Sequence, residues 1–303
     1  MKRLELLIEE ARELTGNTRY DADSGISQAI FVRFFKNAQD ALQKGIANAK
    51  SKLLMVDTTA TVVSGQEAYG YPSDLFLNNI DTLEYSSNGT DYGVPLKKGY
   101  TKDRRSSSNG SPSSYVLRKD DYLLVPPVSS GTLRINYIRK LPALEKRSGY
   151  ISAVTQASGV VSAITVDVAE ASFDGTWINK NYYLCVVDKH GARTVKNIPY
   201  TSVNTTTGVF TLPASFTLAS GESIAVGNYI TVGSDTYNLP DLADICESYL
   251  IKHAVYEAKY GDASQWSDKA VQDMNISLSS LLDSFSRSSD DITEIPITNF
   301  ENI

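Results

Sequence analysis

The sequence predicts an α+β fold: a helical bundle packed with a small antiparallel sheet, plus an inserted all-β sandwich or barrel domain. Three patterns predict it. Near both ends of the chain, apolar residues recur every three or four positions, which is the period of an amphipathic helix. Residues 57–144 carry short strand-like runs separated by Gly, Pro and Ser. Residues 149–234 are rich in Thr, Val, Ile, Ser and Gly, with turn residues about every ten positions, as in small antiparallel sandwiches and barrels.

Two helices are expected at the start of the chain. The first covers residues 2–14, where the apolar side chains share one face, and Gly16-Asn17 ends it. Ser24 or Ser27 is the expected N-cap of the second helix. One stripe of that second helix carries Ile26, Ile30, Phe34, Ala38, Leu42 and Ile46. The two helices are expected to form a hairpin.

Between residues 57 and 144 the apolar period shortens to that of strands. Val62-Val63 and the stretch from Tyr69 to Pro72 flank Ser64-Gly65, which predicts a hairpin. Further strands are expected at residues 75–85, 115–117, 122–125 and 133–138. The stretch 97–114 is basic, Ser-rich and punctuated by Gly, so it is predicted to be a loop.

The helical period returns after residue 235. One helix is expected to start at Leu239-Pro240-Asp241 and to end at Gly261-Asp262, and a second to run from about Ser264 to Phe285. Residues 288–303 have neither a helical nor a strand period, and Pro296 opposes both structures. The predicted organisation is a discontinuous core of residues 1–148 and 235–287, an inserted β domain of residues 149–234, and an extended C-terminal arm of residues 288–303.

Charge is distributed unevenly along the 303 residues, whose net charge is −6. Residues 235–303 hold 13 acidic and 4 basic residues, a net charge of −9, which leaves +3 for residues 1–234. This indicates either a basic partner for the C-terminal part or ordinary solvated helix faces.

No apolar run approaches the ~18 residues that cross a membrane, and the N-terminus is charged too early for a signal peptide. We therefore expect a soluble protein of a reducing cytoplasm, with no membrane partner.

Convergent catalytic groups are missing from the sequence. His190 lies in a polar turn, and His253 lies on an apolar helix, where a core or interface histidine is expected. Cys185 and Cys246 are far apart, without disulfide or metal-ligand spacing. No nucleophile elbow, Cys-x-x-Cys pair or phosphate-binding glycine loop occurs. We expect a protein with no enzymatic activity, no cofactor, and no catalytic or metal site.

The most suggestive polar feature is a basic cluster, which we define as Lys97, Lys98, Lys102, Arg104 and Arg105. Such a cluster, with Tyr100 between its residues in the sequence, can contact phosphates without base specificity. Asp103 and the acidic total argue against a dedicated DNA-binding protein. The alternatives are a solvated loop and a loop that becomes ordered against an acidic protein partner.

Two stretches carry a resemblance to a known family. The first runs from Val62-Val63-Ser64-Gly65 to Tyr71-Pro72-Ser73-Asp74-Leu75. The second comprises Tyr115, Leu117, Leu123, Val125, Pro126, Pro127, Gly131, Leu133, Ile135 and Tyr137, followed by Leu141-Pro142-Ala143-Leu144. With helices at both ends, this order of elements resembles the head-to-tail adaptor (head-completion) proteins of tailed bacteriophages, particularly short-tailed ones. Residues 149–234 are a departure, because compact members lack them.

The resemblance implies a structural virion protein of the head–tail junction, made in the host cytoplasm. It implies a ring of identical subunits, usually a dodecamer, that docks on the portal protein, extends the DNA channel and connects to a tail or nozzle protein. The basic cluster would then contact a partner or line the channel near DNA. The C-terminal arm would dock on the portal or on a neighbouring subunit through Ile292, Ile295, Ile297 and Phe300. An arm folded back on its own subunit is the alternative.

Two other functions are alternatives to an adaptor. A β-rich tail or adhesin module would bind carbohydrate through residues 149–234, with Trp177 and clustered tyrosines stacking on sugars. Such a module would be trimeric or monomeric, whereas an adaptor is monomeric alone and forms a ring with the portal. A nuclease would need a convergent acidic or histidine site, which the sequence lacks.

Overall fold

The computed structural model describes residues 4–16, 26–49, 54–100, 110–126, 130–157, 159–168, 183–190, 192–238, 246–261 and 263–293. The chain divides into two compact units. Unit 1 comprises residues 1–42 and 142–283, and unit 2 comprises residues 43–141 and 284–303. Helices and mainly antiparallel sheets occur together, which confirms the predicted α+β class.

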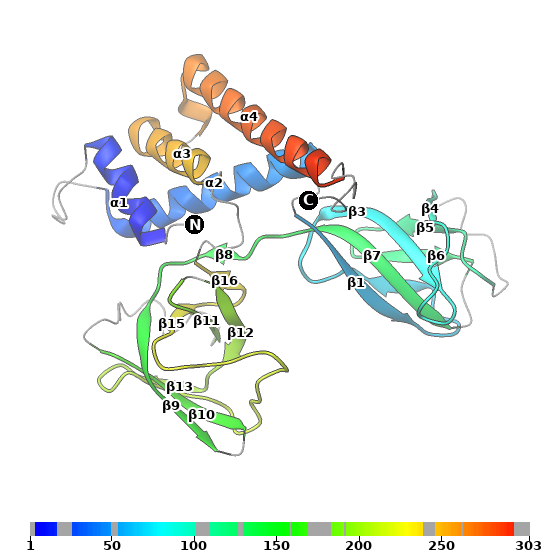
Figure 1. Cartoon of the computed structure of the whole chain (residues 1–303), viewed down its shortest axis with the longest axis horizontal. Coiled ribbons are helices and arrows are strands. Elements are labelled where there is room, and N and C mark those ends of the chain that lie inside the picture. The colour runs from blue at the N-terminus through cyan, green and yellow to red at the C-terminus, as the bar shows by residue number, and fades with distance from the viewer. Residues whose placement is uncertain are drawn as a thin grey trace, which may run out of the picture. The chain divides into compact units, whose positions relative to one another are not determined.

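The α-helices of the described residues are α1 (Leu4–Thr15), α2 (Gln28–Asn48), α3 (Cys246–Tyr260) and α4 (Asp268–Thr293) (Figure 1). The apolar face of α1 is buried, and this helix packs against α3. It also contacts α2, because the Arg12 guanidinium lies 5.6 Å from the centre of the Phe31 ring. Ser27 is the N-cap of α2, because its Oγ accepts the N–H of Ile30 at 3.4 Å. Short-range periodicity predicted both N-terminal helices but not the packing of the first against α3.

The buried stripe of α2 differs in part from the expected one. Ala38, Leu42 and Ile46 are buried as expected, but Ile30 is 36% exposed. Phe31 and Phe35 take the interior positions instead. Because about 3.6 residues make one turn, a strict four-residue repeat drifts around the helix, so positions three and seven residues apart also belong to the buried face.

The C-terminal helices differ from expectation at their outer ends. The expected start of α3 at residues 239–241 lies outside the described residues. Gly261, with φ +84°, ends α3 as predicted, and its N–H bonds the carbonyl of Glu257 at 2.9 Å. Helix α4 continues to Thr293, so residues 288–293 are helical and not extended. Ser and Asp disfavour helical structure less than Gly or Pro does. The first Gly or Pro after residue 287 is Pro296.

Residues 149–234 form a seven-stranded sheet in unit 1, in the order β12-β11-β15-β9-β10-β14-β13. All its neighbouring strands are antiparallel, and the strands are β9 (Gly149–Ala157), β10 (Val160–Val166), β11 (Tyr183–Val187), β12 (Arg193–Pro199), β13 (Ser202–Asn204), β14 (Val209–Thr211) and β15 (Tyr229–Val232). One core cluster contains both Val195 of β12 and Phe210 of β14. The sheet therefore curves around a single core, in keeping with the expected sandwich or barrel.

Unit 2 contains a three-stranded sheet, in the order β1-β7-β3, and a four-stranded sheet, in the order β2-β6-β5-β4. The strands are β1 (Met55–Val62), β2 (Ala68–Gly70), β3 (Leu75–Ser86), β4 (Lys97–Lys98), β5 (Ser114–Leu117), β6 (Asp121–Val125) and β7 (Gly131–Arg139). Leu83 and Leu133 from the first sheet share a core with Tyr115 and Tyr122 from the second.

The expected hairpin around Ser64-Gly65 is wrong as a strand pairing. The turn exists, because Gly65 has φ +77° and the N–H of Gln66 bonds the carbonyl of Val63 at 3.1 Å. However, β1 pairs with β7 and β2 pairs with β6. The turn carries the chain from one sheet to the other, because Val62 and Tyr69 enter the shared core from different sheets. Lys97 and Lys98, expected in a loop, form a short strand parallel to β5.

Candidate interaction surfaces

The segment 149–234 is joined to the helices of unit 1 by a narrow connection, which we call the neck. It consists of β8 (Ala143–Leu144) and β16 (Thr236–Tyr237), which pair in parallel (Figure 1). One strand leads into the segment and the other leads out of it. Tyr237 and Leu144 are fully buried, so the neck is a small packed structure in its own right.

Polar contacts hold the neck to α1. Asn238 Oδ1 accepts the N–H of Leu4 at 2.9 Å. This bond satisfies a free N–H in the first turn of α1 from a residue 234 positions away in the sequence. In the same turn, Glu5 Oε1 accepts the backbone N–H of Arg147 at 2.8 Å and lies 3.6 Å from Arg147 Nε. The Arg147 guanidinium lies 3.8 Å from the centre of the Tyr229 ring. These contacts orient the β segment relative to α1.

A second set of contacts holds the neck to α2. Lys36 Nζ lies 2.7 Å from Glu145 Oε1. Gln39 Nε2 donates to the carbonyl of Pro142 at 2.9 Å and to the hydroxyl of Tyr237 at 3.2 Å. Because Gln39 is buried, both bonds are protected from water and contribute more than surface bonds would. The neck is therefore held from two helices.

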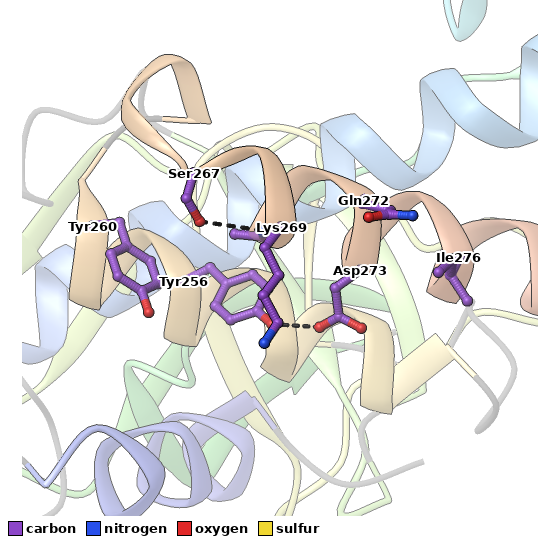
Figure 2. A pocket seen from close by; sticks show the side chains of 8 residues that line it. Tyr256, Tyr260, Ser267, Lys269, Gln272, Asp273 and Ile276 are labelled. Atoms are coloured by element: carbon purple, nitrogen blue, oxygen red, sulfur yellow. Dashed lines mark hydrogen bonds between the residues drawn. The ribbon is translucent and has the colours of Figure 1, made fainter.

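A surface pocket of about 440 Å³ lies between α3 and α4 (Figure 2). Its lining residues are Tyr256, Tyr260, Ser267, Lys269, Ala270, Gln272, Asp273 and Ile276. The Tyr256 hydroxyl donates to the Asp273 carboxylate, and this hydrogen bond raises the pKa of Tyr256 to about 12. Lys252 Nζ lies 2.7 Å from the same carboxylate, and donation from Lys252 and Tyr256 lowers the pKa of Asp273. These groups are engaged with one another, so they tie α3 to α4.

His253 lies on α3 and is buried, as expected of a core histidine. Its ring centre lies 4.9 Å from that of Trp266, and its Nδ1 lies 3.9 Å from Glu257 Oε2. Asn37 donates to the other carboxylate oxygen of Glu257 at 2.7 Å. Burial lowers the pKa of His253 to about 4, so the ring is neutral near pH 7. In the described residues, no cluster of three or more His, Cys, Asp or Glu is arranged to hold a metal ion.

The structure locates only part of the predicted contact residues. Lys97 and Lys98 are exposed on β4, at the edge of the four-stranded sheet. Lys102, Arg104 and Arg105 lie outside the described residues, as do Trp177, Ile295, Ile297 and Phe300. Ile292 falls within α4, although its side chain is not described. Whether the basic cluster and the arm contact partners stays a prediction.

Sequence reasoning missed the neck contacts of Glu5, Arg147 and Asn238. The hydrogen bonds of Glu5 with Arg147 and with Asn238 join positions 142 and 233 residues apart. No local pattern marks such pairs, although Glu5 in the first turn of a helix is itself a common stabilising placement. A signal for the pairing would require covariation among related sequences.

Residues 1–160 match the SU10 adaptor protein family, and the chain belongs to that family. It is therefore a phage adaptor protein, which is a structural class. No curated protein matches the chain. Among the helices of the described residues, none is both long and apolar enough to cross a membrane.

Proposed function

We propose that this adaptor forms a ring of identical subunits that docks on the portal protein, extends the DNA channel and connects it to a tail or nozzle protein. The observation that carries the proposal is the family match over residues 1–160. That range contains α1, α2 and both sheets of unit 2. A dodecamer is the expected ring, because it matches the usual portal.

In this proposal the basic cluster lines the channel or contacts an acidic partner surface. Lys97 and Lys98 support the assignment, because both side chains are exposed at a sheet edge. Contacts of this kind depend on salt and carry no base specificity. Residues 149–234 form an autonomous domain that serves as the platform for a tail component, which their separate core supports.

The test of docking mixes the purified adaptor with its portal protein and counts subunits per complex by electron microscopy and mass measurement. The expected result is a monomer alone and a ring, of about twelve copies, on the portal. A trimer in isolation, with carbohydrate binding, would favour an adhesin instead. Failure to associate with portal at low and at physiological salt would contradict the proposed function.

The basic cluster has its own test. Changing Lys97 and Lys98 to Ser should weaken assembly or DNA retention, and the difference from the parent chain should be largest at low salt and shrink as salt screens the lysine charges. The matched control changes Lys119 and Lys196, which are also exposed, to Ser and removes the same charge elsewhere. If the two double variants behave alike, the cluster is an ordinary solvated surface. Extending the change to Lys102, Arg104 and Arg105 should enlarge the effect.

A further inference from the structure

Edge strands expose unpaired backbone groups, and proteins normally protect them by shortness, charge, proline or irregularity. In the part of the chain that the structure describes, five edges of the larger sheets are protected. β2 and β13 have three residues each, and β4 consists of two lysines. β12 carries register shifts, Lys196 and Pro199. β3 is interrupted near Leu77 and Asn78, which both have positive φ.

β1 is the exception. It pairs with β7 over all eight residues without a register shift, from Met55 opposite Ile138 to Val62 opposite Gly131. It contains no proline, lysine or arginine, and its single charge is Asp57. Threonine and valine make up most of the strand, and both favour extended structure. β1 is thus a regular, unprotected edge.

The side of β1 that faces outward follows from the bonds of β3. The carbonyl of Leu83 accepts the N–H of Leu96 at 2.7 Å, and the carbonyl of Tyr85 accepts the N–H of Gly93 at 3.3 Å. The backbone N–H and C=O groups of Leu83 and Tyr85 therefore point away from β7. Leu83 and Tyr85 lie opposite Ile135 and Leu133 of β7 without bonding to them. The backbone N–H and C=O groups of Ile135 and Leu133 must then point toward β1, because the backbone groups of alternate residues face opposite neighbouring strands.

Ile135 and Leu133 lie opposite Thr58 and Ala60, which therefore bond to β7. The intervening residues Asp57, Thr59 and Thr61 direct their N–H and C=O groups outward. Among the described residues, no hydrogen bond from outside the ladder reaches these three. Their side chains are exposed, whereas Val56, Ala60 and Val62 face the core of unit 2.

We propose that residues 294–299 of a second copy of this chain add to the free edge of β1 as a parallel strand. This inference rests on the proposed ring, since cyclic contacts require two different surfaces on each subunit. The edge of β1 and the segment Glu294-Ile295-Pro296-Ile297-Thr298-Asn299 are such a pair. The ten residues that follow Thr293 can span about 33 Å when extended, which is enough to reach a neighbour.

The position of Pro296 selects the orientation. Proline has no N–H, so Pro296 must face away from β1, and Ile295 and Ile297 must then face it. In antiparallel pairing, hydrogen-bonded residues lie directly opposite and share a face, which would place the two isoleucines opposite two of Asp57, Thr59 and Thr61, on the exposed face. In parallel pairing they lie opposite Thr58 and Ala60, on the face that packs on the core. Parallel addition alone satisfies the proline and the isoleucines.

The added strand would also protect the new edge, because Pro296 then occupies its outer side. Strand addition of this kind gains affinity from main-chain bonds and selectivity from alternate side chains. It stops after one strand, as closed assembly requires.

The first experiment measures binding of a fluorescent peptide of residues 293–303 to a chain that ends at Thr293. Saturable binding is expected. Thr59→Pro, which removes an outward N–H, should weaken it about tenfold or more, and Thr61→Pro is a second such variant. Thr59→Val keeps the N–H and should bind the peptide normally. Thermal unfolding checks that each variant retains the β1–β7 ladder.

Two peptide variants sharpen the assignment. Pro296→Ala should bind as the parent peptide does, because the N–H of residue 296 is not used. Ile297→Ser should bind several-fold more weakly. Equal binding to the Thr59→Pro and parent chains, or no binding up to about 1 mM peptide, would overturn the proposal. Because no portal protein is present, that failure would leave portal docking untouched.

Disulfide cross-linking identifies the occupant and its orientation. Chains with Ala60→Cys or Thr58→Cys are mixed with differently tagged chains carrying Ile297→Cys. Cys185 and Cys246 are buried and free, so they do not interfere. Cross-links between the two tags support the parallel strand from a second copy. Preferential cross-linking of Thr59→Cys instead would contradict the parallel orientation, and cross-linking only when both cysteines are in one chain would contradict the second copy.

Discussion

The core of residues 149–234 is mostly aliphatic, whereas the core of unit 2 is built around tyrosines. Among the described residues, the first core contains fourteen buried residues, which include Ile151, Ile164 and Val186 and a single tyrosine, Tyr200. The second contains Tyr69, Tyr115, Tyr122 and Tyr137. An aliphatic core depends on shape and volume alone. A tyrosine core must also place each buried hydroxyl, so it is sensitive to hydrogen bonds that carry little volume.

The tyrosine hydroxyls of unit 2 mostly bond to turns and strand ends. Tyr69 donates to the carbonyl of Gln66 at 2.9 Å, and Tyr71 to that of Arg118 at 2.7 Å. Tyr137 donates to Asp74 Oδ1 at 2.6 Å. Each ring thus packs in the core while its hydroxyl fixes a connecting segment. The two regions should consequently respond to different kinds of substitution.

Removing volume should have the largest effect in the aliphatic core. Phe210 is fully buried, and its ring packs edge-on against Tyr200 with centres 5.3 Å apart. Phe210→Ala should destabilise the seven-stranded sheet by about 3–5 kcal/mol. Hydrogen exchange should show faster exchange in β10 and β14, with the amides of unit 2 as the control. Unchanged protection in β14 would contradict the aliphatic-core account.

Acid should destabilise unit 1 through His253, which belongs to that unit. Burial lowers the pKa of His253 from 6.5 to about 4, so protonation favours the unfolded chain. The corresponding stability is present above pH 6.5 and is lost as the pH falls toward 4, by about 3 kcal/mol in total.

Fluorescence of Trp266 measures this acid effect in a Trp177→Phe chain, because the Trp266 ring contacts His253. His253→Gln should flatten the pH dependence between pH 6.5 and 4. An equal slope in the His253→Gln chain would assign the effect to carboxylates, of which Glu257 is the one beside the ring.

Removing one hydroxyl should have a smaller but measurable effect in unit 2. Tyr137→Phe keeps the ring and deletes the bond to Asp74, which should cost about 1–3 kcal/mol. Chemical denaturation measures the loss. The substitution Asp74→Asn is informative beside it, because an amide oxygen still accepts the hydroxyl and should retain much of the stability.

The smallest effect is expected from a hydroxyl that lacks a partner. Tyr122 is fully buried, and its hydroxyl has no hydrogen-bond partner in the described part of the chain. Tyr122→Phe removes this desolvated group, so stability should stay the same or rise by about 1 kcal/mol. The same denaturation series compares it with Tyr137→Phe. A loss as large as that of Tyr137→Phe would mean that tyrosine rings, and not their hydroxyls, decide the stability of unit 2.

The sequence predicted local elements better than their partners. The apolar period and the turn residues identified strands β3, β5, β6 and β7. The apolar helical period around His253 likewise indicated that this residue is buried. Both features depend on a few neighbouring positions. The pairing of β1 with β7 could not be read locally, because a turn at Gly65 fits a hairpin and a crossing between sheets equally well. The neck could not be predicted from the sequence for the same reason, because Glu5 and Arg147 become neighbours only after folding.

The parallel neck has a consequence for how this protein family changes over time. Thr236 lies opposite Ala143 and Tyr237 opposite Leu144, so the two ends of the intervening segment are hydrogen-bonded neighbours. A segment with adjacent ends can be lengthened, shortened or exchanged without moving the elements on either side. Relatives that keep Leu144 and Tyr237 in contact can therefore differ in the length and composition of the intervening segment without rebuilding the elements on either side.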